Sequence, residues 1–236
     1  MRLSKGITAK ILWRSFFIQG SWNFKGMQNI GFVYAMLPGL KKLSEDGSDK
    51  AVNRYVKFSN THPYMTPTVM GVFLKLEEQG DLETIEKLKQ TIASSLAAIG
   101  DTFFWATLKP IIALLFLLTV MADRIWGIAL VLVAYNAVHL WTMIRGFSHG
   151  YQKGPGGALE IGKILSLDRT RRISYSIPLL AGMVIGALSQ WENAGTGLPV
   201  SLVIFLASAA AFRFKIGTFW IFYGVFTLTL IWTIIR

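Results

Sequence analysis

The distribution of hydrophobic residues divides this chain near residue 102. Beyond that point, apolar runs of about 20 residues follow one another, and such a run is long enough to cross a bilayer core of about 30 Å as a helix. Two further runs of about 14 residues fit thin spans, a re-entrant pair or helices buried in protein. The pattern predicts an all-α integral membrane protein with about five membrane-embedded helices, at 103–121, 125–144, 176–189, 199–212 and 216–235.

Before residue 102 the pattern predicts amphipathic and re-entrant helices. Large and small apolar residues recur at steps of three and four from Trp13 to Gly31. This stripe predicts one helix that lies at the membrane interface or packs against a partner. We therefore expect a single membrane domain over 1–236, with an amphipathic and re-entrant part at 1–102 and a membrane-spanning part at 103–236.

Two further helices are expected in the first part. The Gly47-Ser48-Asp49 turn predicts a helix that runs to about Phe58. A second apolar stripe occupies 82–99, where Asp81 is suited to cap the beginning of the helix and Gly100 to end it.

Composition and charge support the membrane interpretation and exclude several other classes. The chain has 236 residues, of which 53% are hydrophobic and 16% charged, so it is more apolar and less charged than soluble proteins. Its net charge of +11 comes from residues that flank apolar runs, which does not indicate nucleic-acid binding. The chain contains no cysteine, and its three histidines lack metal-site spacing, so we expect neither a metal nor a cofactor.

The charged loops predict the orientation in the membrane. The segment 145–172 is rich in Lys and Arg, whereas 190–198 has none. The positive-inside rule places the first segment in the cytoplasm and the second outside. With five spans, the N-terminus is then cytoplasmic and the C-terminus external. Nothing at the N-terminus resembles a cleaved signal, so we expect the first segment to stay in the mature protein.

Catalytic motifs are missing from the sequence, so no catalytic residue is predicted. It has no HExxH pair, no Walker loop and no nucleophile elbow. His62, before Pro63, is a conceivable phosphoryl acceptor, but a lone loop histidine is more often a hydrogen-bonding or capping residue. His139 lies inside an apolar run, where an interhelical hydrogen bond is favoured over a role in transport.

A few polar residues interrupt apolar surroundings and are candidates for binding a hydroxyl-rich ligand. Gln19, Asn23, Asn60 and Asp101 each need a partner, because an unpaired buried polar group costs about 1–3 kcal/mol. They either bond backbone at helix ends or contact a ligand, and for Asp101 an N-cap is the favoured interpretation. Lys109-Pro110 predicts a kink, with Lys109 facing a polar cavity or a carboxylate.

Several short blocks occur in a fixed order and resemble the IID subunit of the mannose-family sugar phosphotransferase system. They are Phe-Ile-Gln-Gly-Ser-Trp-Asn-Phe, Asn-Thr-His-Pro, Leu-Glu-Glu-Gln, Gly-Asp-Thr-Phe-Phe-Trp, Lys-Pro and Gly-Tyr-Gln-Lys-Gly, at 17–24, 60–63, 76–79, 100–105, 109–110 and 150–154. The resemblance is close over roughly 10–155 and rests on hydropathy alone elsewhere. So many coordinated blocks are not expected by chance.

The resemblance implies a transport subunit of the bacterial inner membrane. A IID subunit pairs with a IIC subunit to bind and translocate a hexose or amino sugar, and IIC–IID pairs are expected to form a higher oligomer. Cytoplasmic IIA and IIB proteins or domains relay phosphate from phosphoenolpyruvate, and IIB phosphorylates the sugar during uptake. This chain would itself carry no phosphoryl group. The alternative is a regulatory or docking membrane protein on the same fold that moves no sugar.

The resemblance also identifies three departures from the family pattern. Thr102 stands where proline is usual, His62 where glutamine is common, and Lys109 where arginine is common. Lysine lacks the planar two-pronged donor of arginine, so a paired contact at Lys109 is expected to be looser. From their settings in the sequence, the residues predicted to bind the sugar are Gln19, Asn23, Asn60, Asp101 and Lys109.

Overall fold

The computed structural model describes residues 3–44, 48–191 and eight single positions beyond them, namely 206, 207, 210, 214, 220, 223, 224 and 227. Within this part of the chain the regular elements are all helical, apart from isolated bridges between Asn23, Met27 and Ser59. The helices are α1 (Lys5–Ser15), α2 (Asn29–Leu43), α3 (Ser48–Tyr55), α4 (Thr66–Gln79), α5 (Leu82–Gly100), the π-helix η1 (Asp101–Leu108), α6 (Lys109–Met121), α7 (Ile125–Lys153), α8 (Pro155–Ile164), α9 (Leu167–Ser174) and α10 (Ser176–Trp191).

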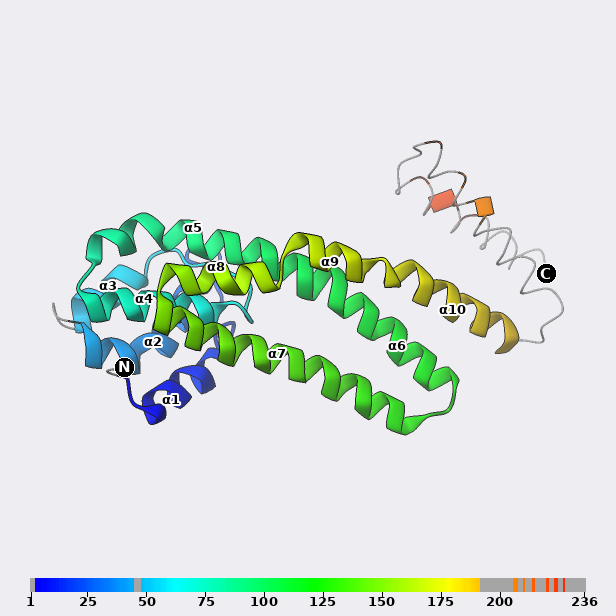
Figure 1. Cartoon of the computed structure of the whole chain (residues 1–236), viewed down its shortest axis with the longest axis horizontal. Helices are drawn as coiled ribbons and strands as arrows, with labels where there is room; N and C mark the ends of the chain where they lie inside the picture. Colours follow the sequence, from blue (N-terminus) through cyan, green and yellow to red (C-terminus); the bar gives the residue numbers. More distant parts are fainter. Residues whose placement is uncertain are drawn as a thin grey trace.

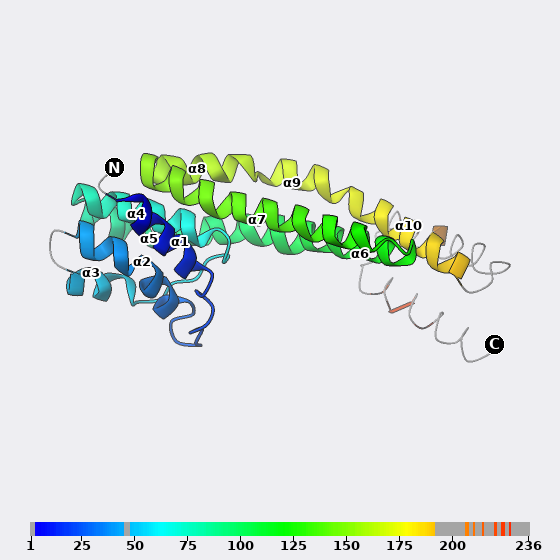
Figure 2. The same ribbon diagram turned by 90° about the horizontal axis from the view of Figure 1, so that it is seen from below.

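The described helices form a bundle at one end and an extended hairpin at the other. Figures 1 and 2 show α1 to α5 gathered with α8 around the C-terminal half of α7. The remainder of α7 and α6 extend away as an antiparallel pair, α9 lies against η1, and α10 runs along α6. The buried apolar core lies in the bundle, where α2 and α4 each supply more large side chains than any other helix.

Two of the described helices are long and apolar enough to cross a membrane. They are the continuous helix Leu82–Met121, made of α5, η1 and α6, and the helix α7, Ile125–Lys153. The predicted runs 103–121 and 125–144 lie within them, and the run 176–189 is helical as α10. The runs 199–212 and 216–235 lie outside the described residues except at single positions, so the number of membrane helices stays a prediction.

The prediction of one helix from Trp13 to Gly31 is wrong. The helix α1 ends at Ser15, and the chain passes through turns before α2 begins at Asn29. Asn23 closes the loop, since its side-chain oxygen accepts from the Gly26 N–H at 2.8 Å and its backbone exchanges two hydrogen bonds with Met27. Met27 has a φ of 58°, a left-handed conformation that no helix accommodates.

The second apolar stripe begins as predicted but does not end as predicted. Asp81 caps α5 by accepting from the Thr84 N–H at 3.1 Å. Gly100 does not end the helix, and Asp101 has helical φ and ψ of −61° and −45°, so the N-cap prediction for Asp101 is wrong. A Cβ at Gly100 would lie 2.4 Å from the Cβ of His62, so this glycine is required for close packing.

The helices α4 and α7 approach each other through a seam of small residues. Gly146 and Gly150 are four apart on α7, a spacing that brings helix backbones together in membrane proteins. A Cβ at Gly150 would lie 2.5 Å from the Thr68 carbonyl oxygen, and a Cβ at Gly71 would lie 2.4 Å from the Phe147 carbonyl oxygen. Backbone atoms cannot move aside as the end of a flexible side chain can, so the close packing of α4 against α7 requires these glycines.

We expect Gly150→Ala to destabilise the protein by about 1–3 kcal/mol, because the added methyl overpacks the seam. Gly156→Ala is the matched control, since nothing lies within 4 Å of a Cβ there. Thermal unfolding of both variants in detergent measures the difference. Equal stability of the two variants would contradict the packing argument.

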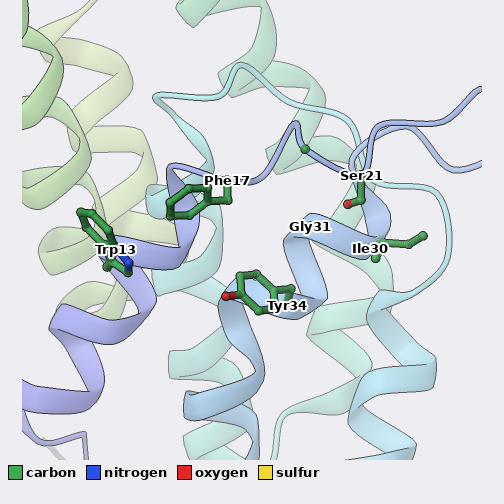
Figure 3. A pocket seen from close by; sticks show the side chains of 7 residues that line it. Trp13, Phe17, Ser21, Ile30, Gly31 and Tyr34 are labelled. Carbon is green, nitrogen blue, oxygen red and sulfur yellow. The ribbon is translucent and has the colours of Figure 1, made fainter.

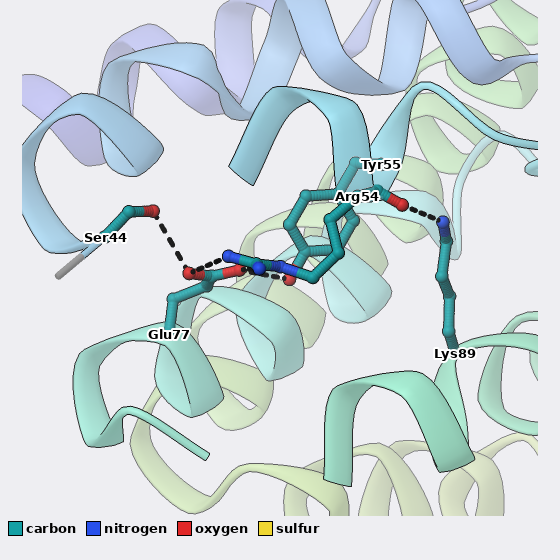
Figure 4. Close-up of polar contacts among 5 residues, drawn as sticks. All are labelled: Ser44, Arg54, Tyr55, Glu77 and Lys89. Carbon is teal, nitrogen blue, oxygen red and sulfur yellow. Dashed lines mark hydrogen bonds and ion pairs between the residues drawn. The ribbon is translucent and has the colours of Figure 1, made fainter. Parts of the chain in front are cut away.

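A buried carboxylate ties α2, α3 and α4 together (Figure 4). Glu77 of α4 is 1% exposed and accepts from Arg54 at 3.1 and 3.2 Å, from the Tyr55 hydroxyl at 2.9 Å and from the Ser44 hydroxyl at 3.1 Å. Burial and the neighbouring carboxylate raise the pKa of the Tyr55 phenol, which therefore stays a donor. Lys89 of α5 donates to the Arg54 carbonyl at 2.6 Å and joins a fourth helix to the group.

We expect Glu77→Gln to cost about 3–5 kcal/mol, because it removes one charge from a buried, hydrogen-bonded ion pair with Arg54. Glu83→Gln makes the same chemical change at an exposed pair with Lys87 and should cost less than about 1 kcal/mol. Chemical denaturation of the two variants in detergent compares them. A loss at Glu77 no larger than that at Glu83 would show that the buried group is not a structural anchor.

Candidate functional site

The helix Leu82–Met121 widens to a π-helix just before Pro110. The Lys109 N–H donates to the carbonyl of Phe104, five residues earlier, instead of four. Proline has no N–H, and its ring collides with the carbonyl four residues before it, so the wider turn accommodates Pro110 without ending the helix. Figure 1 shows the helix changing direction there, between α5 and α6. Such widened turns occur often at functional sites.

The widened turn presents three chemically distinct side chains on one exposed face. Asp101, Trp105 and Lys109 follow one another at intervals of four residues, and all three are exposed, Trp105 by 45%. The Lys109 ammonium lies 5.3 Å from the centre of the Trp105 ring. Phe103 and Phe104 point into the bundle instead. We call Asp101, Trp105 and Lys109 the polar face.

The polar face is out of place on a helix that is apolar enough to span a membrane. A charged side chain at the bilayer centre costs about 2.5–3.5 kcal/mol even on insertion scales, and such residues normally face protein or a water-filled cavity. Chemically, the face offers a carboxylate that accepts hydrogen bonds, an ammonium that donates them, and an indole ring on which an apolar C–H surface can pack. These groups suit a neutral, hydroxyl-rich ligand.

His62 lies against the inner side of the polar face. Its ring stacks on Phe104 at 5.1 Å between centres and lies 4.9 Å from the Trp105 ring. Its Nδ1 accepts from the Tyr64 N–H at 3.2 Å, so the proton of the neutral ring is assigned to Nε2. That Nε2 is buried and has no hydrogen-bond partner among the described residues.

The environment keeps His62 neutral. Burial, helped by the nearby Lys109 and His139, lowers the pKa of His62 to about 4. The side chain is 1% exposed, which does not suit a residue that receives a phosphoryl group from another protein. The hydrogen-bonding role predicted for this histidine is confirmed.

A second group of rings continues from His62 to α7. Tyr64 stacks on His139 with ring centres 3.7 Å apart, and its hydroxyl lies 3.1 Å from that of Tyr135. Phe16, just after α1, meets the His139 ring edge-on, with ring centres 5.8 Å apart. His139 thus joins three segments through ring contacts, and its buried Nε2 has no hydrogen-bond partner in the described part of the chain.

The remaining predicted residues lie on the loops beside this site. Gln19 is exposed in the turn after α1, and Asn60 is half-buried in the segment before His62. The Asn23 amide is used within its own loop, where it donates to Asn29 at 3.1 Å. Gln28 joins the two loops, since its side chain accepts from the Thr61 N–H at 3.2 Å.

The structure thus brings Asp101 and Lys109 together on one face, while the three amide residues belong to neighbouring loops. Sequence reasoning missed Trp105, although its position four residues from both charges was a usable signal. It also missed Gln28, whose buried side chain joins the two loops. Of the departures from the family pattern, Thr102 stays helical and its hydroxyl donates to the Ala98 carbonyl at 2.8 Å.

His62 should make the protein less stable at mildly acid pH. Its folded pKa of about 4 lies below its usual value of 6.5, so between these values only the unfolded chain takes up the proton. Stability is therefore lost as pH falls from 6.5 towards 4, by up to about 2 kcal/mol at pH 5. His62→Gln should flatten the difference in melting temperature between pH 7.5 and pH 5. An unchanged pH dependence in this variant would contradict the assignment.

Comparisons with known proteins show which family the chain belongs to. The family described as the PTS system mannose/fructose/sorbose family IID component matches residues 2–203. The chain is 31% identical to the mannose-specific EIID component of Escherichia coli K12, over 86% of this chain and 74% of that protein. It is 32% identical to the fructose permease IID component of Bacillus subtilis 168, over 86% of this chain and 75% of that protein.

Solved structures show the same relationship. The chain is similar to a chain in the cryo-EM structure of the mannose transporter ManYZ with microcin E492, with a TM-score of 0.60 and 26% identity over 97% of this chain and 95% of that one. A second solved structure, of a membrane protein, has a TM-score of 0.68 and 26% identity over 98% of this chain and 96% of that one. The chain therefore belongs to the mannose/fructose/sorbose family of IID components, the membrane subunits of sugar phosphotransferase transporters.

Proposed function

We propose that this chain is the IID half of a IIC–IID sugar permease in the bacterial inner membrane, and that its polar face contributes to the sugar pathway. The substrate class is a hexose or amino sugar, which IIB phosphorylates during uptake after IIA has passed on the phosphate. The observation that carries the proposal is the exposure of Asp101 and Lys109 on a helix apolar enough to span a membrane.

A partner subunit is the simplest cover for that face. Because charged groups are not left against lipid, the face needs either protein or a water-lined pathway beside it. A IIC subunit packed against α6 and η1 supplies both if the sugar pathway runs between the two chains. The similarity to a chain of the ManYZ transporter, over 97% of this chain, supports such a pairing.

Within this proposal the polar residues have different roles. Asp101 and Lys109 would exchange hydrogen bonds with sugar hydroxyls, and Trp105 would pack on the C–H face of the ring. Gln19 and Asn60 would add contacts from the adjacent loops, whereas Asn23 would keep its loop in shape. We also propose a cytoplasmic N-terminus, an external C-terminus and a higher oligomer of IIC–IID pairs, as the charged loops and the family resemblance suggest.

We expect Asp101→Asn and Lys109→Met each to lower uptake about 10–100-fold, the loss that corresponds to one charge-assisted hydrogen bond. Lys109→Arg should retain uptake, because it keeps the charge and the donors. Glu83→Gln is the control, since it neutralises an exposed acid on the same continuous helix. The measurement is uptake and phosphorylation of labelled hexoses and amino sugars in cells that carry the IIA, IIB and IIC partners.

The same cells without this chain give the decisive comparison. Accumulation of a sugar phosphate only in the presence of the chain supports the transport role and identifies the sugar. If the complex assembles but no sugar depends on the chain, the regulatory or docking role replaces it. If uptake depends on the chain but is unchanged by both Asp101→Asn and Lys109→Met, the polar face is not part of the pathway.

A further inference from the structure

An apolar groove lies between α1 and α2, and none of the residues that line it has been assigned a contact with the sugar (Figure 3). Its volume is about 550 Å³. Trp13 and Phe17 form one wall, and Ile30 and Tyr34 form the other. All four are exposed, Trp13 by 65% and Phe17 by 51%.

Gly31 sets the depth of the groove. A Cβ at this position would lie 2.1 Å from the carbonyl oxygen of Ile18, so only glycine lets the start of α2 approach the turn after α1 this closely. The groove is therefore built into the backbone and is not a chance gap between side chains.

Two contacts give the depth of α1 in the membrane. At its beginning, the Leu3 N–H donates to the Tyr151 hydroxyl at 3.3 Å, and at its end Phe16 contacts His139. Helix α1 thus runs antiparallel to α7, and Lys10 to Arg14 fall beside residues 141–145 of α7. At that point the apolar run 125–144 ends and the basic segment that starts with Arg145 begins. This boundary is expected at the level of the lipid headgroups.

Charge at one end of the groove points to an anion. Lys10, Trp13, Arg14 and Phe17 share one face of α1 or its continuation by their spacing. The Arg14 guanidinium lies 4.4 Å from the centre of the Tyr34 ring and uses one N–H for the Tyr34 carbonyl at 3.0 Å, and four further N–H groups belong to the same fork. The first 44 residues contain no acid but seven basic residues, namely Arg2, Lys5, Lys10, Arg14, Lys25, Lys41 and Lys42.

We propose that this groove binds an anionic phospholipid. Lys10 and Arg14 hold the phosphate at headgroup level, and an acyl chain lies along Trp13, Phe17 and Ile30. Basic residues near the membrane surface attract anionic lipids, and Trp and Tyr rings are enriched at the same level. An apolar helix of another subunit would fill the walls of the groove but leave its basic end without a counter-charge. The inference needs only the depth of α7 and does not rest on the sugar site.

The test uses the full chain copurified with its IIC partner in neutral detergent. Phosphatidylglycerol and phosphatidylcholine with the same acyl chains are added separately, and native mass spectrometry measures how much of each is retained. We expect the wild type to retain phosphatidylglycerol preferentially, and Lys10→Gln to reduce that preference about fivefold. Lys10→Gln combined with Arg14→Gln should remove it.

Lys5→Gln is the matched control. It removes the same charge from an exposed position on the same helix, but five residues before Lys10 and on the other side of α1. It should leave the preference unchanged. Equal effects at Lys5 and Lys10, or equal retention of the two lipids by the wild type, would overturn the proposal.

A second pair of variants distinguishes lipid from protein in the groove. Phe17→Ser and Ile30→Ser should lower phosphatidylglycerol retention while IIC still copurifies. Loss of IIC with an unchanged lipid preference would assign the groove to the partner subunit and overturn the lipid proposal. Sugar uptake in cells is scored separately, so failure here leaves the transport proposal standing.

Discussion

Pro110 cannot donate a backbone hydrogen bond, and the widened turn before it determines which side chains of this helix are exposed and which are buried. In a regular helix, proline would cost about 3 kcal/mol through a lost bond and a steric clash. The π-helix η1 absorbs both effects by bonding Lys109 to Phe104. The helix Leu82–Met121 therefore continues into the apolar segment that is able to span a membrane. Its polar face is exposed, whereas Phe103 and Phe104 are buried in the bundle.

The bundle beside this helix keeps the site in place. Glycines let α4 lie against α7, and the buried Glu77 group holds α2 and α3 on the far side of α4. Gly100 then leaves room for the His62 ring behind the polar face. Rigid support of this kind matters for binding, because side chains that are already ordered lose little entropy when a ligand arrives.

Helix α1 relates the bundle to the bilayer. Its contacts with Tyr151 and His139 fix it along the part of α7 that passes from the apolar run to the basic segment. The apolar stripe predicted from Trp13 to Gly31 is therefore divided between the end of the short helix α1 and the turns that follow it. Aromatic side chains are exposed on both parts. This arrangement explains why so many large apolar residues lie outside the core in the first 44 residues.

The sequence by itself determined the class of the protein, the apolar helices at 103–121, 125–144 and 176–189, the Asp81 cap and the family, because hydropathy, this cap and short motifs are local properties. It did not determine which glycines lie inside a helix, or at which polar residues a helix ends. Gly100 lies inside a helix because His62 packs on it, and the stripe at Trp13–Gly31 breaks because Asn23 and Met27 bond to each other. Only the tertiary structure decided that Asp101 shares a face with Lys109 instead of capping a helix, since that outcome depends on how the chain accommodates Pro110.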